Sequence, residues 1–150
     1  MNKFHLLIII IGLCGLSFLI PNSQEATLNL TIENIQKSKG KMQIAIYKGE
    51  ANFLKDGTAV AAKSVLVENL SPLTITFDNL TFGEYSIAVY HDWNSNDKLD
   101  TNILGIPNEP YGFSNNARSK WGPPKYEIAQ FELNQSKKEM VIQVKKWSKQ

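Results

Sequence analysis

The chain has 150 residues, a formal net charge of +2 and a hydrophobic content of 43%, which together indicate one globular domain with a short extension. So small a net charge does not indicate nucleic-acid binding, which needs a concentrated basic surface. The single cysteine, Cys14, lies close to the N-terminus. The rest of the chain therefore has no disulfide, no thiol nucleophile and no thiolate metal ligand.

The N-terminal segment has the pattern of an export signal. Lys3 and the α-amino group supply positive charge, and residues 6–20 carry no charged side chain. This run has the length of a signal-peptide core and is short for a membrane span, which needs ~20 residues. We therefore expect residues 1–26 to be a signal peptide and residues 27–150 to be the mature domain. The protein would then be periplasmic or extracellular, with no stable membrane span after cleavage.

Two alternatives remain for this segment. Without cleavage it would act as a membrane anchor. Lipidation of Cys14 is the other alternative, but bacterial lipidation needs a small residue before the cysteine, and Leu13 is bulky. Pro21 and the polar residues after it end the apolar run, which favours cleavage between Ser23 and Thr27.

Alternation of apolar and polar residues predicts a series of β-strands in the rest of the chain. Helix is expected only as a short turn at residues 50–54. Strands with one apolar face each pack as two sheets face to face, so we predict an all-β protein, a single antiparallel β-sandwich of about seven strands. The expected strands cover residues 28–33, 42–47, 61–67, 73–78, 85–90, 128–133 and 140–144. The side chains expected in the core are Leu30, Ile32, Ile44, Ile46, Ile75, Phe77, Tyr85, Ile87, Val89, Phe131 and Ile142.

A turn followed by Gly-x-Tyr joins two of the expected strands. Residues 79–85 resemble the corner of transthyretin-like and collagen-adhesin-B-like sandwiches, in which the tyrosine packs in the core and ties the corner to the sheet. The resemblance implies a transthyretin/immunoglobulin-like sandwich and a structural role for Tyr85. Residues 92–124 have no strand periodicity, and a loop of that length is usually functional or disordered. The loop is rich in aromatic residues, which indicates that it is packed.

Oxygen-bearing side chains recur at every second position where this loop begins. The spacing matches positions 1, 3, 5, 7 and 9 of an EF-hand-type calcium loop, in which alternate oxygens turn inward around a hard cation. Leu99 fills the apolar position between the last two ligands. The matching residues are Asp92, Asn94, Asn96, Lys98 (through its carbonyl) and Asp100.

Two positions depart from that calcium-loop pattern. Asp97 stands where the invariant glycine belongs, and Ile103 stands where the closing acid belongs, so Glu109 would have to complete the ligand shell. We therefore hypothesise a weak calcium site, with a dissociation constant of roughly 10⁻⁴ to 10⁻³ M. The alternative is a plain turn in which Asn and Asp side chains bond to the backbone.

His91 is the only histidine after the leader. Alternation places it on the same face of its strand as Ile87 and Val89, so we interpret it as a semi-buried residue that anchors the long loop. A catalytic base would need a nucleophile and an orienting acid, and Asp92 falls on the opposite face of the strand. One histidine also cannot build a histidine-rich zinc site.

Lysines crowd the C-terminal segment. We interpret them as solvated side chains that protect the edge of a last strand, and a site for a polyanion is the alternative. These lysines are Lys137, Lys138, Lys145, Lys146 and Lys149.

Several of these motifs together resemble a bacterial family catalogued as domain of unknown function 2141. The resemblance spans residues 28–144, and its long middle motif is the most specific part. It implies an exported β-sandwich with no established activity. Trp93 departs from the family pattern, in which a polar residue is expected. The segments that carry the resemblance are residues 44–47, 83–92, 94–100 and 105–117 and the pair Pro123-Pro124.

Two functions from different classes are compatible with these observations. The first is an exported, non-catalytic module that binds an unknown protein or glycan of the cell envelope, or that is structural there. The second is a hydrolase that uses Asp92, Asp100 or Glu109 as paired carboxylates, with or without a metal. No nucleophile is recognisable, so we expect a protein that is not an enzyme.

The first function would use the aromatic side chains of the long loop and of the strand before it. Aromatic rings supply a large contact area at a small cost in side-chain entropy. The alternative is that these rings only pack the loop onto the sandwich. The candidate ligand surface consists of Tyr90, His91, Trp93, Tyr111, Phe113 and Trp121.

Overall fold

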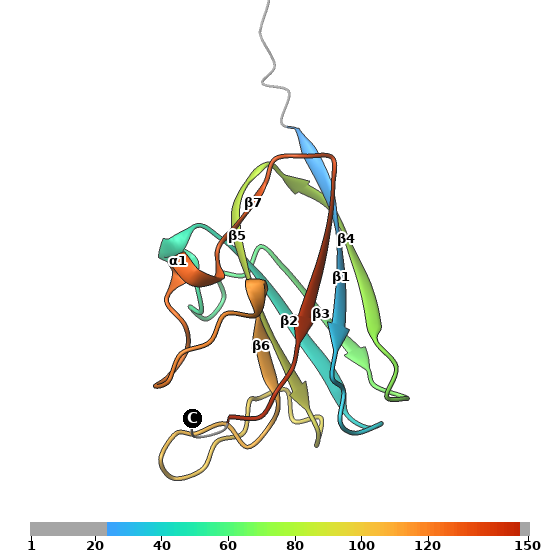
Figure 1. Cartoon of the computed structure of the whole chain (residues 1–150), viewed down its shortest axis with the longest axis vertical. Helices are drawn as coiled ribbons and strands as arrows, with labels where there is room; N and C mark the ends of the chain where they lie inside the picture. Colours follow the sequence, from blue (N-terminus) through green and yellow to red (C-terminus); the bar gives the residue numbers. More distant parts are fainter. Residues whose placement is uncertain (1–23, 148–150) are drawn as a thin grey trace, which may run out of the picture.

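The computed structural model describes residues 24–147, and Figure 1 shows them as an elongated stack of strands. The predicted signal peptide lies outside the described residues, except for residues 24–26. Helix is limited to short turns, and no helix within the described range is long and apolar enough to cross a membrane. The elements are β1 (Glu25–Glu33), β2 (Lys41–Lys48), η1 (Glu50–Asn52), β3 (Ala61–Leu66), β4 (Leu73–Thr81), β5 (Gly83–Asp92), β6 (Tyr111–Phe113), η2 (Ser114–Asn116), α1 (Tyr126–Ala129), β7 (Phe131–Leu133) and β8 (Lys137–Gln143).

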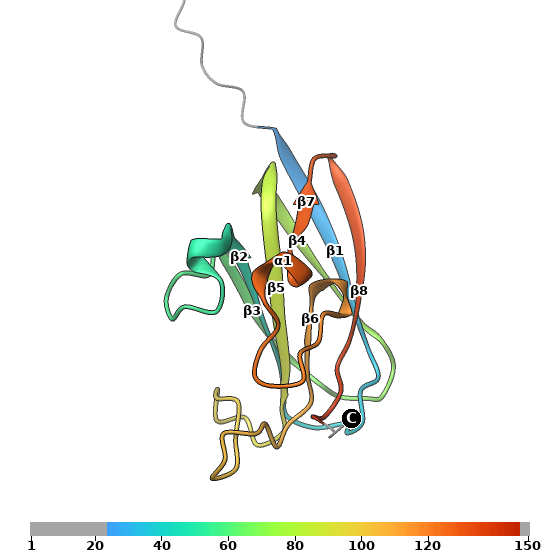
Figure 2. The same cartoon turned by 60° about the vertical axis from the view of Figure 1, so that its left-hand side comes forward.

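The strands form two packed sheets, which Figure 2 shows from the side. One sheet has three strands in the order β4-β1-β8, and the other has five, with β3-β2-β5-β6 along its path and β7 paired with β5. The predicted all-β sandwich is therefore confirmed. One pairing differs from the antiparallel expectation, because β1 and β8 run parallel. Strands distant in the sequence meet there, and local turn signals carry no information about such a pair.

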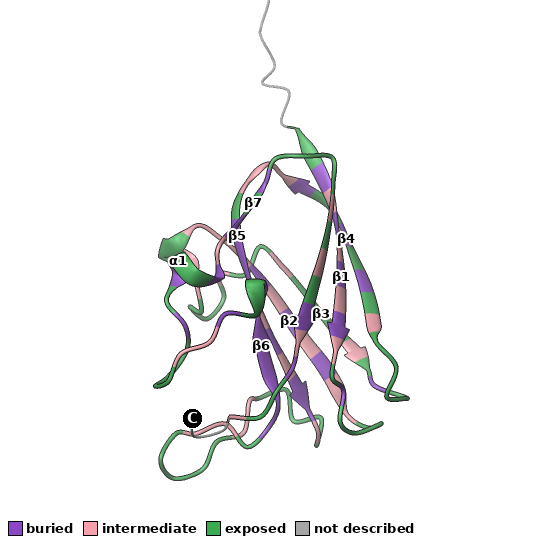
Figure 3. Cartoon of the chain, viewed as in Figure 1, coloured by how far each residue is buried: buried purple, intermediate pink, exposed green. Residues whose placement is uncertain are grey.

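The hydrophobic core lies between the two sheets. The strand alternation puts every second side chain there, and Figure 3 shows the resulting buried bands along β1, β2 and β5. At ~25 cal/mol per Å² of apolar surface removed from water, this layer is the main stabilising term of the fold. All of the side chains expected in the core are buried, namely Leu30, Ile32, Ile44, Ile46, Ile75, Phe77, Tyr85, Ile87, Val89, Phe131 and Ile142.

The corner before β5 is built as its resemblance implies. Tyr85 is buried in the core, and its hydroxyl donates to the backbone carbonyl of Thr81 at 2.5 Å. The helical turn expected at residues 50–54 is present as η1.

Three boundaries differ from the prediction. The expected strand at 128–133 splits into α1 and the short β7, because residue 128 is exposed and its apolar side chain does not continue the inward alternation. β6 lies inside the loop expected at 92–124, making eight strands within residues 24–147. β1 begins at Glu25, two residues before the expected domain start, and Ala26 is already buried.

A second, smaller apolar cluster lies on the outer face of the five-stranded sheet. Tyr111 and Phe113 of β6 form its centre, and Phe53 after η1 packs against it. The rings meet edge to face, with centroids 6.1 Å apart for Phe53 and Phe113 and 6.0 Å apart for Tyr111 and Phe113. Edge-to-face pairs add to the energy of burial. This face of the sandwich is therefore partly covered by its own loops.

The turn between β1 and β2 touches the end of β5 through Gly40. Its φ is +74°, a left-handed conformation that favours glycine, and an added Cβ would lie 2.0 Å from the carbonyl oxygen of Asp92. Gly57 has nearly the same φ, +72°, but no neighbour within 4 Å of such a Cβ. The two glycines therefore share the backbone strain and differ in the available space.

We expect Gly40→Ala to lower the free energy of unfolding by about 3 kcal/mol more than Gly57→Ala, because only Gly40→Ala adds a clash to the strain. Urea unfolding of both variants measures the difference. Equal losses would mean that the contact between the β1–β2 turn and β5 is not tight.

Candidate functional site

The end of β5 is anchored to the β1–β2 turn by His91. The ring is fully buried, its Nε2 lies 2.8 Å from the carbonyl oxygen of Lys39, and its Nδ1 accepts a bond from the Trp93 indole N–H at 3.3 Å. A carbonyl can only accept, so Nε2 carries the proton and the ring is the neutral Nε2–H tautomer. The structural role predicted for His91 matches this geometry.

Trp93 itself lies under two lysines. The Nζ of Lys37 is 3.6 Å from the ring centroid of Trp93, and the Nζ of Lys146 is 4.4 Å from one of its ring centroids. Cation–π contacts of this kind are attractive because the ring face is negative. The indole thus connects the β1–β2 turn, the long loop and the C-terminal segment.

Two buried carboxylates close the long loop. Asp92 accepts backbone N–H bonds from Asn96 and Asp97, at 3.1 and 2.8 Å. Glu109 accepts backbone N–H bonds from Trp93 and Asp100, at 2.7 and 3.1 Å. A carboxylate with two such bonds is well satisfied away from water. Both acids therefore have a structural role: Asp92 holds the turn at residues 92–97, and Glu109 joins the end of the loop to residues 93 and 100.

The remaining predicted calcium ligands bond to one another. The amide groups of Asn94 and Asn96 donate to the two carboxylate oxygens of Asp100, at 2.7 and 3.0 Å. The side-chain oxygen of Asn94 accepts from the backbone of Asn96, and that of Asn96 accepts from the backbone of Lys98. These are the contacts of an Asn/Asp-rich turn.

The donor set still suits a hard cation, because carboxylate and amide oxygens are the ligands that calcium takes. Within residues 24–147 no three His, Cys, Asp or Glu side chains gather in a way that could hold a metal ion. The proposed site therefore depends on amide and carbonyl oxygens as well as on Asp92 and Asp100. Calcium binding stays a prediction.

A large groove lies on the outer face of the five-stranded sheet, with a volume of about 1050 Å³. Its floor is built from small side chains, because the register places Ala45 of β2 opposite both Ala62 of β3 and Ala88 of β5. Larger side chains at these positions would fill the space. The three alanines therefore leave the sheet surface open between bulkier neighbours.

The sides of the groove come from other parts of the chain. Tyr47 near the end of β2 and Leu54 just after η1 contribute one part, and residues 99–107 of the long loop contribute Leu99, Leu104 and Ile106. The segment 121–123 contributes another part of the lining, together with Trp147 near the C-terminus. The walls are thus mostly apolar.

The structure divides the predicted aromatic surface in two. Tyr90, Tyr111, Phe113 and Trp121 line the groove, whereas His91 and Trp93 do not. Burial raises the pKa of Tyr90 to about 12, and the nearby carboxylates of Asp92, Asp97 and Glu109 add to the rise. Tyr90 therefore presents a neutral hydroxyl at the groove.

Sequence reasoning missed the alanine floor. Ala45 and Ala88 sit at polar-face positions of their strands, where a small residue is an unremarkable choice for a solvent-facing surface. The available signal was that the neighbouring strands β2, β3 and β5 each carry one outward-facing alanine, namely Ala45, Ala62 and Ala88. That signal becomes visible only when the register is known.

The three acids of the hydrolase alternative do not line this groove. Asp92 and Glu109 are buried against backbone N–H groups, and Asp100 accepts from two asparagine amides. The hydroxyl of Ser114 already makes two structural hydrogen bonds, since it donates to the Ala129 carbonyl and accepts from the Ile87 N–H.

The sequence pattern of a bacterial family described as "Uncharacterized protein conserved in bacteria (DUF2141)" matches residues 30–141. The chain belongs to this family. The match includes the calcium-loop motif, the alanine floor and β6. No curated protein and no solved structure is similar enough to count as a match. Membership of this family accounts for the sequence pattern of residues 30–141.

Protonation of His91 should destabilise the domain. Burial lowers the pKa of His91 below its ordinary value, partly opposed by its bond to the Lys39 carbonyl. Well above the unfolded pKa of about 6.5 the ring is neutral in both states, and the stability is complete. As the pH falls below that value, the unfolded chain takes up a proton that the folded ring resists, so the free energy of unfolding decreases.

The check is thermal unfolding of the wild type and of His91→Gln at about pH 7.5 and about pH 5.5. We expect the wild type to lose more stability between the two pH values than the variant does. Equal losses in the two proteins would show that His91 is not the responsible group.

Calcium should stabilise the domain if the loop binds it. With a dissociation constant of ~0.1 mM, calcium at ~1 mM would add about 1.4 kcal/mol to the free energy of unfolding. Thermal unfolding in calcium and in chelator measures this. Asp100→Asn should abolish the difference, and Asp97→Asn, which changes the same charge at a non-ligand position, should retain it. Equal midpoints for the wild type would leave only the Asn/Asp-rich turn.

Proposed function

We propose that this protein is an exported, non-catalytic binding module whose groove on the five-stranded sheet holds an apolar ligand. The observation that carries the proposal is the groove itself, at about 1050 Å³ and with apolar side chains on its floor and walls. Pockets for small molecules are typically ~300–1,000 Å³ and mostly apolar, with a few polar groups. Export is supported by the signal-like segment at residues 1–26.

The exposed apolar side chains at the groove support binding. Leu104 is 77% exposed and Trp121 is 73% exposed, although both belong to its lining. Apolar side chains held together in water mark a surface that is covered when a partner binds. Each Å² of apolar surface that a ligand covers contributes ~25 cal/mol to binding, so contact with Leu104 and Trp121 favours the bound state.

An apolar chain fits this groove better than a glycan does. Sugar rings stack on aromatic side chains but also need hydrogen-bond partners for their hydroxyl groups, since unpaired buried polar groups are costly. The floor of Ala45, Ala62 and Ala88 offers no side-chain partner. The polar residues of the lining, which include Gln43, Tyr47, Lys63, Ser64, Tyr90 and Thr101, lie around this floor and not on it.

The long loop supports the same proposal as a wall of the groove. Glu109 joins the end of the loop to residues 93 and 100, so Leu99, Leu104 and Ile106 are carried on a closed loop and not on a free one. A preformed wall lowers the entropy cost of binding. Calcium, if bound at residues 92–100, would stiffen that wall further.

The hydrolase alternative has less support. A carboxylate pair for hydrolysis must face the substrate across a cleft. Asp92 and Glu109 use their oxygens on the loop backbone, and neither they nor Asp100 line the groove.

Filling the alanine floor should abolish binding. Ala45→Phe puts a ring at the centre of the floor, whereas Thr74→Phe adds the same ring to an exposed position on β4 in the other sheet. The probe is N-phenyl-1-naphthylamine, a neutral dye whose fluorescence rises in apolar surroundings. We expect the wild type and Thr74→Phe to bind the dye equally, and Ala45→Phe to bind it at least tenfold more weakly, a loss of about 1.4 kcal/mol. Equal binding by all three would refute the proposal.

A further inference from the structure

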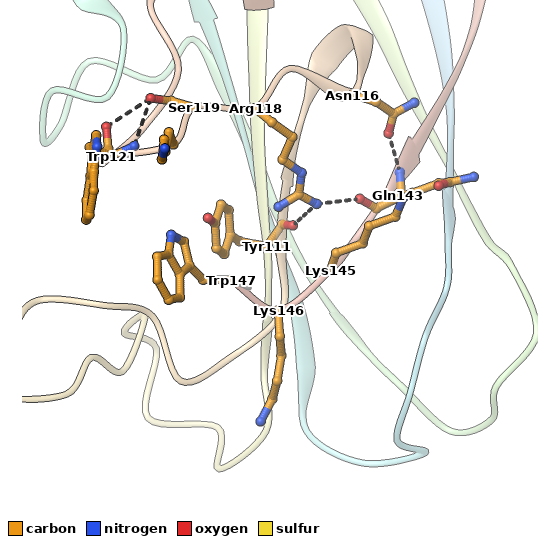
Figure 4. A pocket seen from close by; sticks show the side chains of 10 residues that line it. Tyr111, Asn116, Arg118, Ser119, Trp121, Gln143, Lys145, Lys146 and Trp147 are labelled. Carbon is orange, nitrogen blue, oxygen red and sulfur yellow. Dashed lines mark hydrogen bonds between the residues drawn. The ribbon is translucent and has the colours of Figure 1, made fainter. Parts of the chain in front are cut away.

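A second, smaller pocket adjoins the groove and differs from it in charge. Figure 4 shows it between the segment after β6 and the end of the chain after β8. Its volume is about 340 Å³. Tyr111, Trp121 and Trp147 line both spaces. The groove and this pocket are therefore neighbouring parts of one surface.

The second pocket is cationic. Its lining includes Arg118, Lys120, Lys145 and Lys146, and no acidic side chain among the described residues lines either space. The two ion pairs found within residues 24–147 join Lys41 to Asp97 and Lys137 to Glu139, so neither neutralises this set. Cations that line one pocket without an acidic neighbour make its potential positive, which attracts an anion.

Arg118 is held in place before any ligand arrives. Its Nη2 donates to the backbone carbonyls of Tyr111 and Gln143, at 3.0 and 3.3 Å, and Figure 4 shows both bonds. The guanidinium also lies 5.0 Å from the ring centroid of Tyr111. A guanidinium has five N–H donors in a fixed planar fork, so donors at its other nitrogens can serve a carboxylate, sulfate or phosphate group.

The lysines contribute unequally. Lys146 extends away from the rings in Figure 4. Its Nζ lies 4.4 Å from a ring centroid of Trp93 and takes part in the cation–π contact there. Lys145 is exposed, and its backbone is fixed by two bonds to Tyr111, at 3.1 and 3.0 Å. Lys145 therefore starts from an ordered point beside Arg118 and can turn its ammonium toward the same anion.

We infer that the ligand is a single-chain anionic amphiphile, with its charged end at Arg118 and Lys145 and its apolar chain along the alanine floor of the groove. This inference rests on the proposed function. Each space alone would suit a simpler ligand, an inorganic anion for the pocket or a neutral hydrocarbon for the groove. Their shared residues, Tyr111, Trp121 and Trp147, join a cationic end to an apolar channel, which is the complement of an amphiphile.

The test compares decanoate with methyl decanoate, two ligands with the same apolar chain, of which only the first is charged. Each is used to displace the neutral dye N-phenyl-1-naphthylamine from the purified protein. We expect decanoate to displace the dye at a roughly tenfold lower concentration than the ester. The preference should shrink as salt is raised, because the ions screen exposed charges.

Two charge variants locate the anion site. Arg118→Gln combined with Lys145→Gln should abolish the preference for decanoate while leaving displacement by the ester unchanged. Lys137→Gln removes one charge from β8 in the other sheet, at a position outside the pocket, and should keep the preference. The ester serves as the folding control, since a misfolded variant would lose both ligands.

The outcomes separate the two proposals. Equal displacement by acid and ester in the wild type would overturn the anionic end and leave the apolar groove standing. Failure of the wild type to bind the dye or either competitor would overturn both. Association with anionic phospholipid vesicles that Ala45→Phe leaves intact, without displacement of the dye by decanoate, would assign the cations to a membrane surface and overturn the inference.

Discussion

The backbone N–H groups of a long loop need acceptors, and in this protein two buried carboxylates supply them. Asp92 at the end of β5 and Glu109 before β6 each accept two N–H bonds. A buried carboxylate without hydrogen-bond donors is costly, so the backbone N–H groups of the loop gather around these two acids. The closure carries the apolar side chains of residues 99–107 to the outer face of the sheet.

The outer face of the five-stranded sheet is partly apolar and partly open to water, two properties that are seldom found together. A sheet face turned to water is normally polar, and an apolar face is normally covered. Here Phe53, Tyr111 and Phe113 cover one part of it, while Ala45 and Ala88 leave another part open. Alanine side chains leave a hollow on the sheet and expose little apolar surface of their own. The groove therefore has apolar walls around a floor that carries no exposed aromatic ring.

The fold was predictable because its signal is local and repeated. Leu30, Ile44 and Ile87 alternate with polar neighbours, and a period of two puts each of them on one face of a strand. His91 was predictable for the same reason, as the last inward residue of β5. The split at residues 128–133 was not, since Ile128 continues an apolar pattern but is exposed. The parallel pairing of β1 with β8 was also hidden, because no turn connects them.

The sequence by itself determined the all-β class, the core residues and the family, since each depends on patterns within single segments. It also indicated the aromatic residues Tyr90, Tyr111, Phe113 and Trp121. Only the tertiary structure decided that these rings share a groove with three alanines from separate strands, and that Arg118 lies beside Lys145. Register between strands and contacts across many residues create those neighbours, and neither is encoded in the spacing along one segment.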